Sequence, residues 1–161
     1  KKDYSTDFQT ISAGKYHSTD WINVKDTAAI HEGFVTGYAS GEYNEDFAEV
    51  YANYVTSSDE SWEARLDKGI EYTYTGLNAK GETIQVPFWG KPTNADLVGA
   101  GFRKLTGAKI TSTKGADIIN SKLEIVRSYL QDSWGIDLEK LRAIVLRRSA
   151  EVMNMDLTTL N

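Results

Sequence analysis

Two acidic side chains, Glu45 and Glu49, lie four residues apart, and Tyr38 precedes the first of them by seven residues. Apolar residues around them recur at the spacing of one helix face, and they are Phe47, Val50, Tyr51, Tyr54 and Val55. At about 100° per residue, the two glutamates fall on the opposite side of the same helix. The pattern therefore predicts a helix with one buried face and one acidic face.

The acidic face has two interpretations. In the first it is solvated, with Asn44 as the N-cap and Asp46 among the acids that suit the first turn of a helix. In the second it packs closely against another element, because the residues that share it are small and uncharged: Ala48, Ala52 and Thr56. Buried acids need a cation or hydrogen-bond donors, and a metal ion would supply the cation.

Residues 33–55, which read GFVTGYASGEYNEDFAEVYANYV, and residues 133–145, which read SWGIDLEKLRAIV, resemble a known family. They are similar to gluzincin zinc metallopeptidases and, more closely, to the zinc-binding metallopeptidase lipoproteins of gut Bacteroidetes. The resemblance covers most of residues 1–67 and 114–152. It implies that Glu45 is the third protein ligand of a zinc ion and that Glu49 holds a zinc-binding histidine. Tyr38 would stabilise the oxyanion of the tetrahedral intermediate.

The sequence departs from this family at its central motif. Such enzymes carry HExxH on an earlier helix, with two histidine ligands and a glutamate general base. This chain has two histidines, and His31 opens the segment HEGFV, which lacks the second histidine. We interpret His31 as a residue near the end of a short helix over 26–33 and His17 as a surface residue. We expect the chain to be the C-terminal part of a longer metallopeptidase, without zinc and inactive by itself.

Two alternatives to the metallopeptidase stay open at this stage. One is a non-catalytic binding protein of a nutrient-import system for glycans or peptides, built on a degenerate zincin-like scaffold. The other is a helical domain without a ligand, which requires the side of Ala48 and Ala52 to be exposed to solvent. The missing histidines fit both.

Composition limits the remaining possibilities. At 161 residues, with 40% hydrophobic and 25% charged residues, the chain is expected to form a single domain over 1–161. A net charge of −5 argues against a nucleic-acid partner, and no apolar run is long enough to span a membrane.

The resemblance implies a peptide or protein substrate and a lipid-anchored protein of the cell envelope, in the periplasm or on the outer-membrane surface. The oligomeric state is left open.

The fold class predicted from periodicity is mainly α with a minor β-hairpin. Residues 71–113 do not match the family pattern, and we interpret them as an insertion that contains the hairpin. Residues 115–153 predict an antiparallel helical hairpin, which would end a zincin-like catalytic domain. Arginines of its second helix, Arg142 among them, are expected to be solvated. Glycines on both sides of Tyr38 predict a flexible loop there.

Overall fold

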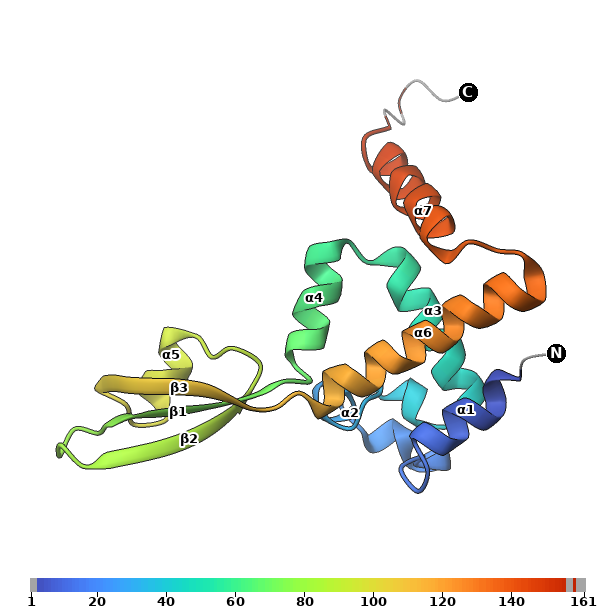
Figure 1. Cartoon of the computed structure of the whole chain (residues 1–161). Coiled ribbons are helices and arrows are strands. Elements are labelled where there is room, and N and C mark those ends of the chain that lie inside the picture. The colour runs from blue at the N-terminus through green and yellow to red at the C-terminus, as the bar shows by residue number, and fades with distance from the viewer. Residues whose placement is uncertain (1–2, 156–157, 159–161) are drawn as a thin grey trace.

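A helical body and a projecting β-sheet arm make up the structure (Figure 1), a computed structural model that describes residues 3–155 and 158. The elements of the body are α1 Tyr4–Ile11, η1 Ser18–Asn23, α2 Asp26–His31, η2 Tyr38–Ser40, α3 Tyr43–Thr56, α4 Asp59–Asp67, α6 Lys114–Trp134 and α7 Leu138–Met153, where η marks short 3₁₀ helices. The arm consists of β1 Glu71–Leu77, β2 Thr83–Trp89, α5 Asn94–Gly99 and β3 Lys104–Ser112. Among the described residues, we find no helix with the length and apolar character that crossing a membrane requires.

The core of the body lies where α3 and α6 meet α1 and α2. Helix α6 contributes Ile119, Leu123 and Val126, which recur at helical spacing and are all buried. Apolar side chains from the rest of the body complete this core, and the largest fully buried ones are Phe8, Phe34, Ile30, Leu138, Val35 and Val50. The core therefore ties α3, which carries Glu45 and Glu49, to the longest helix of the chain.

Two glycines allow the backbone to leave and re-enter the body at one place. Gly69 follows α4, Gly115 lies in the first turn of α6, and the N–H of Ala116 donates to the carbonyl oxygen of Gly69 at 3.2 Å. A Cβ on Gly115 would meet the carbonyl oxygen of Ile30 and would lie 3.0 Å from the Cα and the oxygen of Gly69. This contact between backbones requires glycine at position 115.

We expect Gly115→Ala to lower the free energy of unfolding by about 1–2 kcal/mol, because the clash with backbone atoms outweighs the gain in helix propensity. Urea denaturation measures this change. Gly99→Ala is the matched control, since a Cβ at that helical glycine meets no atom within 4 Å. Gly99→Ala should be neutral or stabilising by about 0.5 kcal/mol. Equal stability of the two variants would contradict a close approach at Gly115.

The arm is a three-stranded antiparallel sheet in the order β2-β1-β3. The hairpin of β1 and β2 confirms the minor β-hairpin expected from the sequence. The third strand, β3, was missed because almost all of it is exposed and it shows no apolar alternation. Leu97 of α5 and Phe102 after it are buried within the arm, outside the core of the body.

The last two helices differ from the predicted antiparallel hairpin in their packing. Gly135, at φ +64°, ends α6, and Asp137 caps α7 by accepting from two backbone N–H groups. Helix α7 then packs chiefly against α3, and in Figure 1 it leads away from α6. From Ile144 to its end, α7 leaves the apolar side chains of Ile144, Val152 and Met153 exposed.

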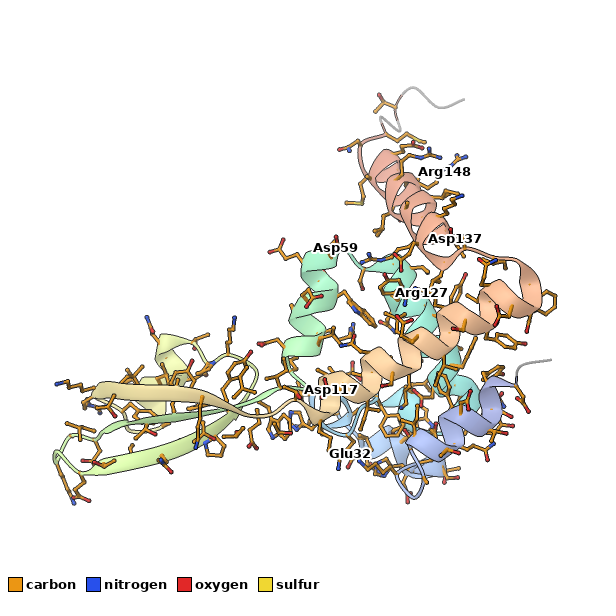
Figure 2. All side chains as sticks on the ribbon, viewed as in Figure 1. Glu32, Asp59, Asp117, Arg127, Asp137 and Arg148 are labelled. Carbon is orange, nitrogen blue, oxygen red and sulfur yellow. The ribbon has the colours of Figure 1, made fainter. Side chains whose placement is uncertain are left out.

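Arg142 explains how α7 is attached to α3, and it corrects the expectation that this arginine is solvated. The side chain is buried, and its guanidinium donates to the backbone oxygens of Tyr54 and Ser57 at 2.8 and 2.7 Å. It also pairs with the carboxylate of Asp59 at 2.6 Å. Figure 2 labels Asp59 at the start of α4 and Asp137 at the start of α7, near this attachment. Arg142 therefore fixes the end of α3 through hydrogen bonds that only a guanidinium can make together.

Candidate functional site

Tyr38 lies near Glu45 and Glu49 in the structure. The spacing in the sequence predicted a shared helix side for the two glutamates only. The nearby Glu45 carboxylate is the first cause that raises the pKa of Tyr38 above its ordinary value. The negative charges of Glu45 and then of Glu49 act in the same direction. Tyr38 is 41% exposed and both glutamates are half-buried. The three side chains form one polar group at the surface.

The turn that carries Tyr38 is fixed by short contacts, which corrects the expected flexible loop. The N–H of Gly37 donates to the carboxylate of Asp26 at 2.8 Å, and the hydroxyl of Ser40 donates to the carbonyl of Gly37 at 2.6 Å. A Cβ on Gly37 would run into the carbonyl oxygen of Val24. A Cβ on Gly41 would run into the Glu45 carboxylate. The two glycines therefore serve close packing, and the turn fixes the backbone at Tyr38.

An ion pair buried between α3 and α6 fixes the helix that carries the glutamates. Asp46 and Lys122 are both fully buried, and their carboxylate oxygen and ammonium nitrogen lie 2.7 Å apart. Tyr16 donates to the same oxygen of Asp46 at 2.8 Å, and Lys122 donates to the carbonyl of Gly33 at 2.9 Å. Burial raises the pKa of Asp46 to about 6 and lowers that of Lys122, and the ion pair opposes both shifts.

Sequence reasoning missed this ion pair, although a signal for it was present. Asp46 stands four residues before Val50 on the apolar side of α3, and Lys122 stands three residues after Ile119 on the apolar side of α6. A charged residue at a core position of a helix needs a partner of opposite charge. Asp46 therefore positions its neighbour Glu45 from within the core.

The start of α3 differs from the expected cap. Glu42, in extended conformation, is the N-cap, and its side chain makes no capping hydrogen bond. Asn44, expected as the N-cap, lies within the helix, and its side-chain oxygen accepts from the hydroxyl of Tyr4 at 2.8 Å.

The acidic side of α3 is open to solvent. Ala48 and Ala52 are both exposed, so the condition for a domain without a ligand is met in this structure. Within the described part of the chain, Glu49 accepts a hydrogen bond from Asn53 at 2.9 Å, and neither Glu45 nor Glu49 is paired with a lysine or arginine. Two carboxylates without a cation lie beside a surface that could take another element.

The residues present fit part of a metal site and not a whole one. His17 pairs with Glu32 at 3.0 Å, and the His31 ring stacks on Trp89 with ring centres 4.2 Å apart. In residues 3–155 and 158, no group of three histidine, cysteine, aspartate or glutamate side chains could hold a metal ion. Zinc sites in proteins have three or four protein ligands. Glu45 could therefore supply one ligand, and the others would have to come from elsewhere.

Comparison with known proteins gives two matches. A family model described as "Putative zinc-binding metallo-peptidase" matches residues 1–139. The crystal structure of a protein of the same description from Bacteroides caccae is similar to this chain, with 31% sequence identity and a TM-score of 0.65. That match covers 97% of this chain and 44% of the Bacteroides protein, so the chain spans less than half of its length. No curated protein matches. With most of its length matched by the family model, the chain belongs to the family described as putative zinc-binding metallo-peptidases.

Proposed function

We propose that this chain is part of a gluzincin-like zinc metallopeptidase that hydrolyses peptide bonds. Glu45 serves as the third protein ligand of the zinc ion. Glu49 accepts a hydrogen bond from a zinc-binding histidine, and Tyr38 donates to the oxyanion that forms on the substrate. The HExxH segment, with two histidines and the general base, comes from a part of a longer protein outside these 161 residues.

The observation that carries this proposal is the meeting of Tyr38 and Glu45 on an open helix side in a chain of this family. The effect of the Glu45 carboxylate on the pKa of Tyr38 supports a phenol close to the proposed zinc ligand. The exposed surface of Ala48 and Ala52 has small side chains, which suits close packing of a further helix. The half-length match to the Bacteroides protein is also consistent with a missing partner segment.

The chemistry divides between the metal and this chain. Bound zinc lowers the pKa of its water to about 7 and polarises the substrate carbonyl. Glu45 contributes negative charge and fixes the position of the metal relative to α3. The backbone on both sides of Tyr38 is held by the contacts of its turn, which supports a defined position for the residue before a substrate arrives.

We expect Glu45→Ala to abolish tight zinc retention in the longer protein, because it removes one of three protein ligands. Elemental analysis of the purified protein measures this, with about one zinc per chain expected before the substitution and none in the 161-residue chain. Glu63→Ala is the matched control, since Glu63 is an exposed helical glutamate of α4. Unchanged zinc content in Glu45→Ala would overturn the ligand assignment.

A second candidate function has one observation in its favour. No complete group of metal ligands exists in the described residues, and both histidines have other partners. A non-catalytic binding protein for glycans or peptides, built on the same scaffold, agrees with this. Absence of zinc from the longer protein after reconstitution would favour that candidate. Both candidates place the protein in the cell envelope.

A further inference from the structure

The indole of Trp21 lies against the phenol ring of Tyr38. Their ring centres are 4.9 Å apart and their planes are at 89°, which is the edge-to-face geometry that aromatic pairs prefer. The Cδ1 atom of Trp21 also lies 3.2 Å from the place where a Cβ on Gly41 would be. The same glycine faces the Glu45 carboxylate. Trp21 therefore borders the turn on which Tyr38 and Glu45 meet.

The segment that carries Trp21 is tied to that turn through the backbone. The N–H of His17 donates to the carbonyl of Ser40 at 2.7 Å, and the N–H of Ser18 donates to the carbonyl of Gly41 at 3.1 Å. Ser18 has a φ of +52°, a left-handed conformation that a residue other than glycine rarely adopts. Strained backbone of this kind persists where the surrounding contacts require it. The backbone of this segment is thus fixed to the turn by contacts other than the ring pair of Trp21 and Tyr38.

We propose that Trp21 is a positioning residue that holds the Tyr38 ring in one orientation on the turn beside Glu45. Tyr38 is 41% exposed, so polar contacts of its phenol compete with hydrogen bonding to solvent. The edge of an indole against the ring favours one side-chain rotamer by about two- to tenfold. Any effect of Trp21 on catalysis rests on the proposed function. Its effect on the orientation of the Tyr38 ring can be measured in this chain alone.

The test uses the 161-residue chain labelled with ¹³C in its tyrosine rings, with the Tyr38 signal identified through Tyr38→Phe. Glu45→Gln should move the Tyr38 ring resonances in the unsubstituted chain. In Trp21→Leu, those resonances should lose their ring-current shift and should no longer respond to Glu45→Gln. Trp21→Phe should keep the response, because a phenyl ring can still offer an edge. Trp134→Leu is the control, since Trp134 is 65% exposed at the end of α6.

A response of Tyr38 to Glu45→Gln that is as large in Trp21→Leu as in the unsubstituted chain overturns the inference. In the zinc-loaded longer protein, Trp21→Leu should lower kcat about tenfold and leave KM within about twofold, with Trp21→Phe restoring most of the rate. An unsubstituted longer protein without zinc-dependent activity would overturn the proposed function. It would not overturn the role of Trp21, which the tyrosine spectra decide.

Discussion

Replacing Lys122 by methionine should lower the free energy of unfolding by about 3–5 kcal/mol, as removal of one partner from a buried ion pair typically does. The substitution leaves the Asp46 carboxylate in a fully buried position with Tyr16 as its remaining donor. It also leaves the carbonyl of Gly33 without the ammonium group. Urea denaturation of the 161-residue chain measures the loss.

Two further variants test whether the loss of stability comes from the unpaired charge that Lys122→Met leaves in the core. Lys109→Met, at an exposed lysine of β3, should change stability by less than about 0.5 kcal/mol. Asp46→Asn combined with Lys122→Met should recover much of the loss, because no uncompensated charge is then buried. If Lys122→Met alone were as stable as Lys109→Met, the ion pair would not hold α3 on α6.

Tyr38→Phe should lower kcat of the zinc-loaded longer protein by about 10²–10³-fold, the usual loss when one donor to an oxyanion is removed. Zinc content should stay unchanged, because the phenol is not among the proposed ligands. Steady-state kinetics on a peptide substrate, together with elemental analysis, measure both quantities.

The matched control for this substitution is Tyr74→Phe. Tyr74 lies on β1 in the arm, where its ring packs edge-to-face on Phe88. It belongs to a different part of the chain from Glu45 and Glu49. We expect it to leave kcat within about twofold. A rate for Tyr38→Phe equal to that of Tyr74→Phe would exclude an oxyanion role for Tyr38. Loss of zinc in Tyr38→Phe would instead point to a role in holding the metal.

The sequence predicted helix α3 well, because local spacing decides where an amphipathic helix forms. A helix places residues four apart on one side, so Glu45 and Glu49 had to share a face once the apolar stripe was recognised. The preceding turn brings Tyr38 onto that face. Strand β3 shows the opposite case. Its exposed residues LTGAKI follow no period, and the β1 residues with which it pairs lie 27 to 41 positions earlier in the chain.

Arg142 and Lys122 show why buried charges were harder to predict than helix α3. Each is a long cation in an amphipathic helix, and such residues are usually solvated. Their partners lie far away along the chain. Arg142 binds Tyr54 and Asp59, and Lys122 binds Asp46. Spacing within one helix cannot reveal a partner on another helix. The same limit applies to Trp21, whose contact with Tyr38 depends on how two loops meet.

The meeting of Gly69 and Gly115 has a consequence for how relatives of this protein can diverge. Because the chain leaves and re-enters the body between touching backbones, a segment of almost any length can be closed there at little entropic cost. No residue of 71–113 belongs to the main core. The arm can therefore become longer or shorter, or be exchanged, during evolution without a change in the two glycines or in the helices that hold Glu45.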